Sequence, residues 1–93
     1  MLATKIKMKP GCYNSQNLLE IDSIYIDGCN NPGFYKKDIL HDHLQDNPKS
    51  IKVNINPTYP TLVPAKSTYG EKYVRSTPNN STQDNLLNLP REK

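Results

Sequence analysis

Arg75 is the residue whose type and position best suit binding chemistry. It follows Tyr73 by two positions at the end of a short apolar stretch, and the hydroxyls of Ser76 and Thr77 come directly after it. A guanidinium presents a planar fork of donors that matches a phosphate or a carboxylate, and a tyrosine ring can stack on a base. The alternative is structural: Arg75 would bind backbone carbonyls or the carboxylate of Asp84 and hold the end of the chain in place.

A polar stretch downstream of this arginine supplies further hydrogen-bonding groups. Asn79 and Asn80 could recognise the hydrogen-bonding edge of a ligand. They could also form Asx-turns, with Asp84 as the N-cap of a short helical turn over 84–89. The ligand-binding residues that the sequence predicts are Tyr73, Arg75, Asn79 and Asn80.

Tyrosine is frequent in this chain, which has one phenylalanine and no tryptophan. In a protein with few apolar residues, tyrosines can supply amphipathic packing at the edge of a sheet. They can equally form a stacking surface for a base or an anchor for a protein partner. The residues concerned are Tyr13, Tyr25, Tyr35, Tyr59, Tyr69 and Tyr73.

The thiols and imidazoles do not have the spacing of a metal site. Cys12 and Cys29 are far from a C-x2–4-C pair, and His41 and His43 on a helix would point their rings roughly 200° apart. A nucleophilic pair of Cys29 with His41 has no identifiable group to orient it. Phosphate-binding loops, dinucleotide fingerprints, zinc-protease motifs and nucleophile elbows are absent from the sequence. We therefore expect no catalytic residue, no metal and no cofactor.

Length and composition indicate one small domain with a thin core. The chain has 93 residues, of which 34% are hydrophobic, and a net charge of +3. A domain of this size gains stability from self-association, so we expect a homo-oligomer. The apolar runs are too short to cross a bilayer, the N-terminus lacks the apolar region of a secretory signal, and two cysteines are too few for a disulfide framework. We therefore expect a cytoplasmic protein without membrane contact.

The densest basic cluster lies near the N-terminus. Lys5, Lys7 and Lys9 would share one face of a strand over 4–9, opposite Ile6. That row is either the solvated face of an amphipathic strand or a patch that faces phosphate. Elsewhere lysines and acidic residues are interspersed, so nucleic acid is not an expected partner.

Hydrophobic periodicity predicts the elements that must position these residues. Alternation predicts strands over 3–8, 21–26, 51–55 and 73–75, and a helix over 35–45. In that helix Leu40 and Leu44 are spaced i, i+4, with Ile39 and His43 as a parallel pair beside them. No residue suited to an N-cap precedes the helix, so packing must hold it.

These elements predict an α+β fold. We expect a small, mostly antiparallel sheet in the order strand–strand–helix–strand–strand, with one helix on one face and a docked C-terminal segment. Residues 1–93 would form a single domain. Residues 57–64 would be a proline-rich loop, and residues 78–93 a polar turn and an apolar plug formed by Leu86, Leu87 and Leu89.

The end of the chain resembles a known family. The matching residues are Gly70-Glu71-Lys72-Tyr73-Val74-Arg75-Ser76-Thr77-Pro78-Asn79 and Asp84-Asn85-Leu86-Leu87-Asn88-Leu89-Pro90. They resemble the signature of the DUF3892 family, small bacterial and phage proteins without an established function. Members typically end in a tyrosine–arginine strand, a polar turn and an Asn-Leu-x-x-Leu-Pro close. The resemblance implies a fold and brings no catalytic residues.

These observations favour a non-catalytic binding protein. In one hypothesis it sequesters a small anionic, nucleotide-like ligand, with Arg75 on a phosphate and a tyrosine on the base. The phage members of the family suggest counter-defence, in which the ligand is a host signalling nucleotide. In the alternative it binds a host protein, as an inhibitor, through an exposed strand or a tyrosine patch. A hydrolase would need a pair of acidic residues that the sequence does not place together.

Overall fold

The structure is a computed structural model, and it describes residues 1–56, 58–77 and 85–92. Within these ranges the elements are, in chain order, β1 (Leu2–Met8), the 3₁₀ helix η1 (Leu18–Glu20), β2 (Ile21–Asp27), β3 (Gly33–Lys36), α1 (Lys37–Asp46), β4 (Lys52–Val53), β5 (Leu62–Lys66), β6 (Lys72–Ser76), the 3₁₀ helix η2 (Asn85–Asn88) and β7 (Arg91–Glu92). The predicted α+β class is confirmed, with mostly antiparallel strands.

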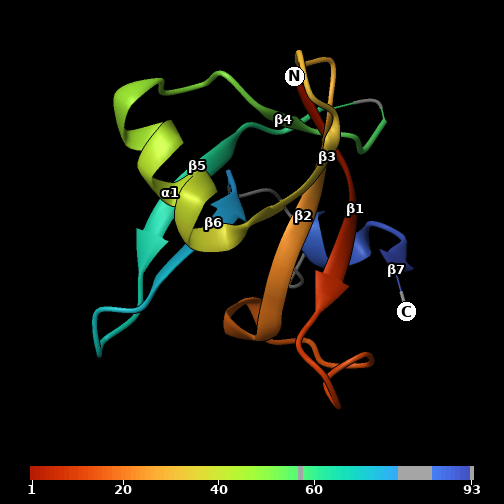
Figure 1. Ribbon diagram of the computed structural model, residues 1–93, viewed down its shortest axis with the longest axis vertical. Helices are drawn as coiled ribbons and strands as arrows, with labels where there is room; N and C mark the ends of the chain where they lie inside the picture. Colours follow the sequence, from red (N-terminus) through yellow and green to blue (C-terminus); the bar gives the residue numbers. More distant parts are fainter. Residues whose placement is uncertain (57, 78–84, 93) are drawn as a thin grey trace.

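The strands of the described residues form two sheets instead of the expected one. The larger sheet has the order β3-β2-β1-β4, and β7 also pairs with β1. β4 runs parallel to the first half of β1, at Leu2 and Ala3, and β7 runs parallel to the second half, at Ile6 and Lys7. Strands β5 and β6 form a separate antiparallel hairpin. Figure 1 shows α1 and this hairpin on one side of the long strands β1 and β2, with β7 on the other.

A bulge in β1 decides which of its side chains face the core. The register with β2 skips Thr4, because the residues on either side of it, Ala3 and Lys5, pair with consecutive residues of β2. This irregularity breaks the two-residue alternation, so Ala3 and Ile6 are both fully buried although they are three positions apart. Lys5 and Lys7 remain exposed on the opposite face, as the sequence predicts.

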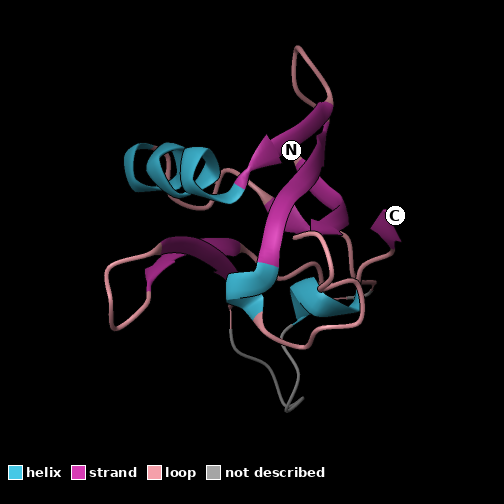
Figure 2. Ribbon diagram, turned by 60° about the horizontal axis from the view of Figure 1, so that its bottom comes forward, coloured by secondary structure: helices cyan, strands magenta, loops and turns pink. Residues whose placement is uncertain are grey.

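One hydrophobic core joins the larger sheet, the helix and the hairpin. Helix α1 contacts mainly β5 and β6, and in Figure 2 it lies next to them. The buried stripe of the helix has the spacing i, i+3, i+4, i+7 and consists of Lys37, Leu40, His41 and Leu44. Leu40 and Leu44 are buried as predicted, whereas Ile39 is 54% exposed. No helix of the described ranges is long and apolar enough to cross a bilayer.

Strand β3 was not predicted from the sequence. Its four residues follow a turn-rich loop and show no alternation of their own. The predicted helix over 35–45 therefore includes the last two residues of β3, whereas α1 begins at Lys37. Pairing with β2 forms the strand, and Phe34 packs edge-to-face on Tyr25 with ring centroids 5.3 Å apart. The helix N-cap is Lys36, which makes no side-chain capping bond, as the poor capping signal predicts.

Two other sequence predictions differ in extent. The strand expected over 51–55 is limited to Lys52–Val53, because only these residues pair with β1. The proline-rich stretch expected to be a loop ends in β5, which contains Pro64. A proline has no N–H to donate to a neighbouring strand. Strand β5 tolerates Pro64 because, in the described residues, it forms a sheet with β6 alone, which leaves its other edge without a partner strand.

The C-terminal segment completes the core. The side chains of Leu86, Leu87 and Leu89, which are too apolar for a free tail, are 0%, 5% and 4% exposed. The backbone N–H of Ile6 donates to the carbonyl of Pro90 at 2.9 Å, which leads the chain into β7. The segment is therefore part of both the sheet and the core.

Candidate functional site

Tyr73 and Arg75 lie on one face of β6. They are two residues apart and half-buried, on the opposite face of the strand from the buried Val74. Their cross-strand neighbours on β5 are Ala65, opposite Tyr73, and Val63, opposite Arg75. The structure thus brings these two predicted site residues together on the outer face of the hairpin.

The other two predicted site residues, Asn79 and Asn80, lie outside the described residues, and so does Asp84. That Tyr73 and Arg75 bind a ligand therefore stays a prediction.

His41 fixes the position of β6 from the side of the helix. Its ring is 2% exposed, and Nδ1 lies 3.1 Å from the carbonyl oxygen of Tyr73. With a proton on Nδ1, the ring donates this hydrogen bond to the carbonyl. From the sequence, His41 is considered as a possible metal ligand or as a partner of Cys29. In the structure His41 is a buried residue that links α1 to the backbone of β6.

A groove beside the ends of β1, β2 and β3 gathers positive charge. Its volume is about 610 Å³. The polar and aromatic side chains that line this basic groove are Lys7, Lys9, Tyr13, Asp22, Lys36 and Glu92. The N-terminal lysine row thus extends into a concave surface, because β3 and β7 flank it.

The lysines of the basic groove differ in their ion pairs. Asp22 accepts hydrogen bonds from Lys36 Nζ at 2.9 and 3.0 Å, and this contact lowers its pKa below the ordinary range. Lys9 lies 3.5 Å from Glu71, which also binds Lys37. No ion pair between described residues involves Lys7. Lys7 is therefore available to an anion, and among the described residues Lys9 is held only by its 3.5 Å contact with Glu71.

The Lys37–Glu71 pair joins the start of α1 to the turn between β5 and β6. Lys37 is 8% exposed, and its Nζ donates to Glu71 Oε2 at 2.6 Å and to the carbonyl of Leu19. The sequence shows this lysine only as an unfavourable charge in the first helical turn. Its partner is 34 residues away, so no local pattern could have revealed the pair.

Replacing Lys37 by methionine is expected to reduce the loss of stability at acid pH. The hydrogen bond from Lys37, followed by its charge, lowers the pKa of Glu71 below the ordinary 4.5. A carboxyl with a lowered folded-state pKa stabilises the fold above its unfolded pKa, and the stabilisation is lost as the pH falls through the folded pKa. Urea denaturation at about pH 7 and about pH 3 measures the difference in unfolding free energy.

The control for this prediction is Lys52→Met, which removes an exposed lysine that has no ion pair with a described residue. Lys52→Met should keep the wild-type pH dependence. An unchanged pH dependence in Lys37→Met would show that Glu71 gains nothing from its buried partner.

Cys12 and Glu20 form a small polar cluster after β1. The thiol donates to Glu20 Oε2 at 3.0 Å, and the hydroxyl of Ser15 donates to Glu20 Oε1. The hydrogen bond to this carboxylate, together with desolvation, raises the pKa of Cys12. The thiol therefore stays protonated at neutral pH and is a weak nucleophile.

The structure does not bring the cysteines and histidines into one site. Cys12 lies beside Glu20, Cys29 lies in the loop between β2 and β3, and His41 is buried under the helix. Among the described residues, no three His, Cys, Asp or Glu side chains gather as a metal site would require. His43, instead of His41, lies in the same pocket as Cys29.

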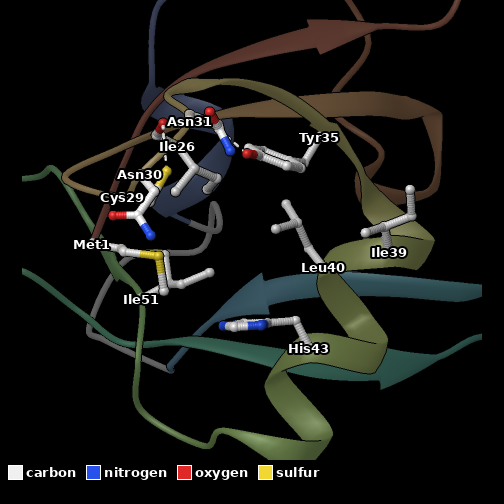
Figure 3. Close-up of a pocket in the computed structure, with 10 residues that line it drawn as sticks. All are labelled: Met1, Ile26, Cys29, Asn30, Asn31, Tyr35, Ile39, Leu40, His43 and Ile51. Atoms are coloured by element: carbon white, nitrogen blue, oxygen red, sulfur yellow. Dashed lines mark hydrogen bonds between the residues drawn. The ribbon is translucent and has the colours of Figure 1, made fainter.

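That pocket lies between α1, the β2–β3 loop and the segment that enters β4, and Figure 3 shows its side chains pointing into a shared space. Its volume is about 310 Å³. We call it the apolar pocket, since it is lined by Met1, Ile26, Ile39, Leu40 and Ile51 together with the uncharged polar residues Cys29, Asn30, Asn31, Tyr35 and His43. Sequence reasoning did not find it, because its residues come from five separate stretches of the chain.

The tyrosines do not form a common patch in the described structure. Tyr13 lines the basic groove, Tyr35 lines the apolar pocket, and Tyr25 packs on Phe34. Tyr69 is 99% exposed in the turn between β5 and β6. Their roles are therefore separate, and each has to be tested by itself.

Comparison with known proteins yields one match. A family model described as "Protein of unknown function (DUF3892)" matches residues 20–90. No curated protein and no solved structure matches the chain. The matched range contains the hairpin and all of the apolar pocket except Met1. It leaves out β1, β7 and most of the groove residues, among them Lys7, Lys9, Tyr13 and Glu92.

Proposed function

The chain belongs to the DUF3892 family, and we propose that it is a non-catalytic binding protein that captures a small anionic, nucleotide-like ligand in the basic groove. The observation that carries the proposal is the convergence of Lys7, Lys9 and Lys36 with Tyr13 around one concave surface. Two separate parts of the chain contribute these side chains, β1 with its following loop and the end of β3, and β2 pairs with both strands and brings them together.

The charges of the groove favour an anion. Lys7 has no ion-pair partner among the described residues, and Lys9 shares Glu71 with Lys37. A phosphate that enters the groove would gain charge-assisted hydrogen bonds from Lys7 and Lys9 without breaking the Lys36–Asp22 pair. Lysine is a suitable phosphate ligand at such a site, since it acts as a point charge on a long, adaptable stem.

The aromatic side chain and the size of the groove favour a nucleotide. Tyr13 is 38% exposed, and its hydroxyl donates to the carbonyl of Arg91 at 3.5 Å, which steadies the ring at the edge of the groove. A base can stack on such a ring. A volume of about 610 Å³ lies within the range of ordinary small-molecule sites.

The ion-paired acidic residue of the groove supports binding without turnover. Asp22 is hydrogen-bonded to Lys36, which lowers its pKa, and a carboxylate with a lowered pKa is a poor general base at neutral pH. We therefore propose that the ligand is held and released unchanged.

A thermal-shift screen with mono-, di- and cyclic nucleotides tests the proposal. A ligand that binds only the native state at about 100 times its Kd stabilises it by about 2.7 kcal/mol. In a domain of this length that corresponds to a rise in Tm of roughly 10–20 °C. Lys7→Glu should abolish the rise, because it places a negative charge where the phosphate binds.

The matched control is Lys66→Glu, which makes the same charge change at an exposed lysine of β5, outside the groove. It should keep the full rise. Arg75→Ala tests the site predicted from sequence: if it abolishes the rise and Lys7→Glu does not, the ligand binds the hairpin instead.

Native mass spectrometry of the complex completes the test, since it reports the bound mass and the number of protein copies together. The ligand should be recovered intact after denaturation. The proposal fails if no nucleotide raises the Tm of the wild-type protein, or if the recovered molecule has changed mass.

A further inference from the structure

We propose that the apolar pocket of Figure 3 is a second binding site, separate from the basic groove, and that it takes an uncharged, largely apolar small molecule with one or two hydrogen-bonding groups. The proposal is independent of the nucleotide site, with which the pocket shares no lining residue.

The walls of the apolar pocket belong to the rigid part of the fold. Ile26 on β2, Leu40 on α1 and Ile51 before β4 are 2%, 4% and 1% exposed, so they are fixed by the core behind them. The rim is different, because Ile39 and Met1 are 54% and 39% exposed. A ligand in the pocket would cover apolar surface that the fold leaves in water, and that burial favours binding.

The side chains that line the pocket are mostly apolar or uncharged. None of its lining residues is a lysine, arginine, aspartate or glutamate. His43 Nε2 lies 3.3 Å from the hydroxyl of Ser50, which gives the ring a hydrogen-bonding partner. A charged ligand would lose hydration here without meeting a lysine, arginine or carboxylate side chain, so the lining favours an uncharged ligand.

The polar groups at one side of the pocket define its hydrogen-bonding capacity. The hydroxyl of Tyr35 donates to the carbonyl of Asn31, which leaves its oxygen lone pairs as acceptors. Desolvation raises the pKa of Tyr35, so the phenol stays neutral. The side-chain amides of Asn30 and Asn31 offer both donors and acceptors. In Figure 3 these groups lie together on the β2–β3 side, opposite the apolar side chains of the helix.

The size of the pocket favours a small molecule over a protein surface. A volume of about 310 Å³ is at the lower end of small-molecule sites, which begin near ~300 Å³. Stable protein interfaces bury at least ~1,000 Å² in total, far more surface than such a pocket presents. The competing occupant is a second copy of the chain that packs on the pocket. The dependence of Cys29 alkylation on protein concentration distinguishes this second copy from a small molecule.

Cys29 provides a reporter for occupancy, because its thiol lies in the pocket and donates to the carbonyl of Ile26 at 3.8 Å. N-ethylmaleimide alkylates thiols, and peptide mass spectrometry follows Cys29 and Cys12 separately in the same sample. Indole, a neutral apolar molecule with one N–H donor, is the probe. At about four times its Kd, indole should slow the alkylation of Cys29 about fivefold, since only unoccupied protein reacts.

Two internal comparisons make the result specific. The alkylation rate of Cys12, which lies beside Glu20 outside the pocket, should not change with indole. Indole-3-carboxylate, the anionic counterpart of the probe, should protect Cys29 much less. Equal slowing of both thiols by indole, or equal protection of Cys29 by the anion, would overturn the proposal.

A pair of variants locates the probe. Ile39→Glu places a carboxylate at the mouth of the pocket at a position that tolerates it, because the side chain is largely exposed. It should abolish the protection by indole. Gln45→Glu adds the same charge on an exposed position of α1 away from the pocket and should leave the protection intact. Protection in Ile39→Glu equal to wild type would place indole elsewhere.

The dependence on protein concentration decides between a small molecule and a second copy. If the pocket is open in solution, the alkylation rate constant of Cys29 without indole is the same at low and high protein concentration. A rate constant that falls as protein concentration rises, with Cys12 unaffected, would show that a second copy covers the pocket and would overturn the proposal.

Discussion

Replacing Leu86 by alanine should lower the unfolding free energy by about 3–4 kcal/mol, a large share of the stability of a domain of this length. Leu86 is 0% exposed and belongs to the same core as Ile6, Leu62 and Val74. Its truncation removes apolar contacts and leaves a cavity that the surrounding strands cannot close completely. Urea denaturation followed by circular dichroism measures the change as a shift of the midpoint at constant slope.

Two further variants control the Leu86→Ala result. Leu18→Ala truncates a leucine at the edge of the same core and should cost only about 1 kcal/mol, because this side chain is half-buried. Leu86→Met keeps the volume and should cost less than about 1.5 kcal/mol, which keeps the protein folded for comparison. If Leu86→Ala costs no more than Leu18→Ala, the C-terminal segment is not part of the core in solution.

The second large effect is expected at Arg91, which binds the end of the chain to the loop after β1. Its guanidinium donates to the carbonyls of Tyr13 at 2.8 Å, Ser15 at 2.7 Å and Leu87 at 3.2 Å. Charge-assisted bonds of this kind are stronger than neutral ones, so Arg91→Ala should cost about 2–3 kcal/mol. Arg91→Lys should recover only part of the loss, because a single ammonium cannot replace the planar fork.

Hydrogen exchange distinguishes a local effect of Arg91→Ala from general destabilisation. The N–H of Ile6 donates to Pro90, directly before Arg91, and should exchange faster in the variant when the C-terminal segment detaches. Amides between β2 and β3 do not depend on this segment and should keep their protection under native conditions. Unchanged exchange at Ile6 together with an unchanged unfolding midpoint would contradict the assigned role.

The contacts of Arg91 also join the two segments of the chain that lie outside the family match. Tyr13 and Ser15 precede the matched range 20–90, and Arg91 follows it. The two segments outside the match therefore bind each other, and β7 pairs with β1. The basic groove lies where they meet, since Lys7 and Glu92 both line it. A nucleotide site in this groove would depend on both of these segments.

Arg75 and Arg91 illustrate what could be inferred without coordinates. The sequence draws attention to Arg75 because a tyrosine and two hydroxyls surround it, and local composition is visible in a sequence. Arg91 lies in a polar C-terminal tripeptide with no such signal. Its partners Tyr13 and Ser15 are 78 and 76 residues away, so only folding shows that Arg91 closes the structure.

The elements that the sequence predicts well are those with their own periodicity. In strands β1, β2 and β6 and in helix α1, apolar residues recur with the period of the element over several residues. The core residues that this periodicity predicts include Ile6, Ile24, Leu40 and Val74, which are all buried. The short strands β3 and β7 have four and two residues and carry no period, and β4 keeps only two residues of the alternation over 51–55. They exist because a neighbouring strand offers unpaired backbone groups, which is a tertiary condition.

The amino-acid sequence alone determined the fold class, the family resemblance, the solvent-facing lysine row and the apolar C-terminal leucines, since each of these depends on residue types at short range. The tertiary structure decided which surfaces are concave. The basic groove needs β3 and β7 beside the lysines of β1, and the apolar pocket needs α1 beside the β2–β3 loop. A binding site is a relation between distant segments, and pairing and packing, instead of local preference, set that relation.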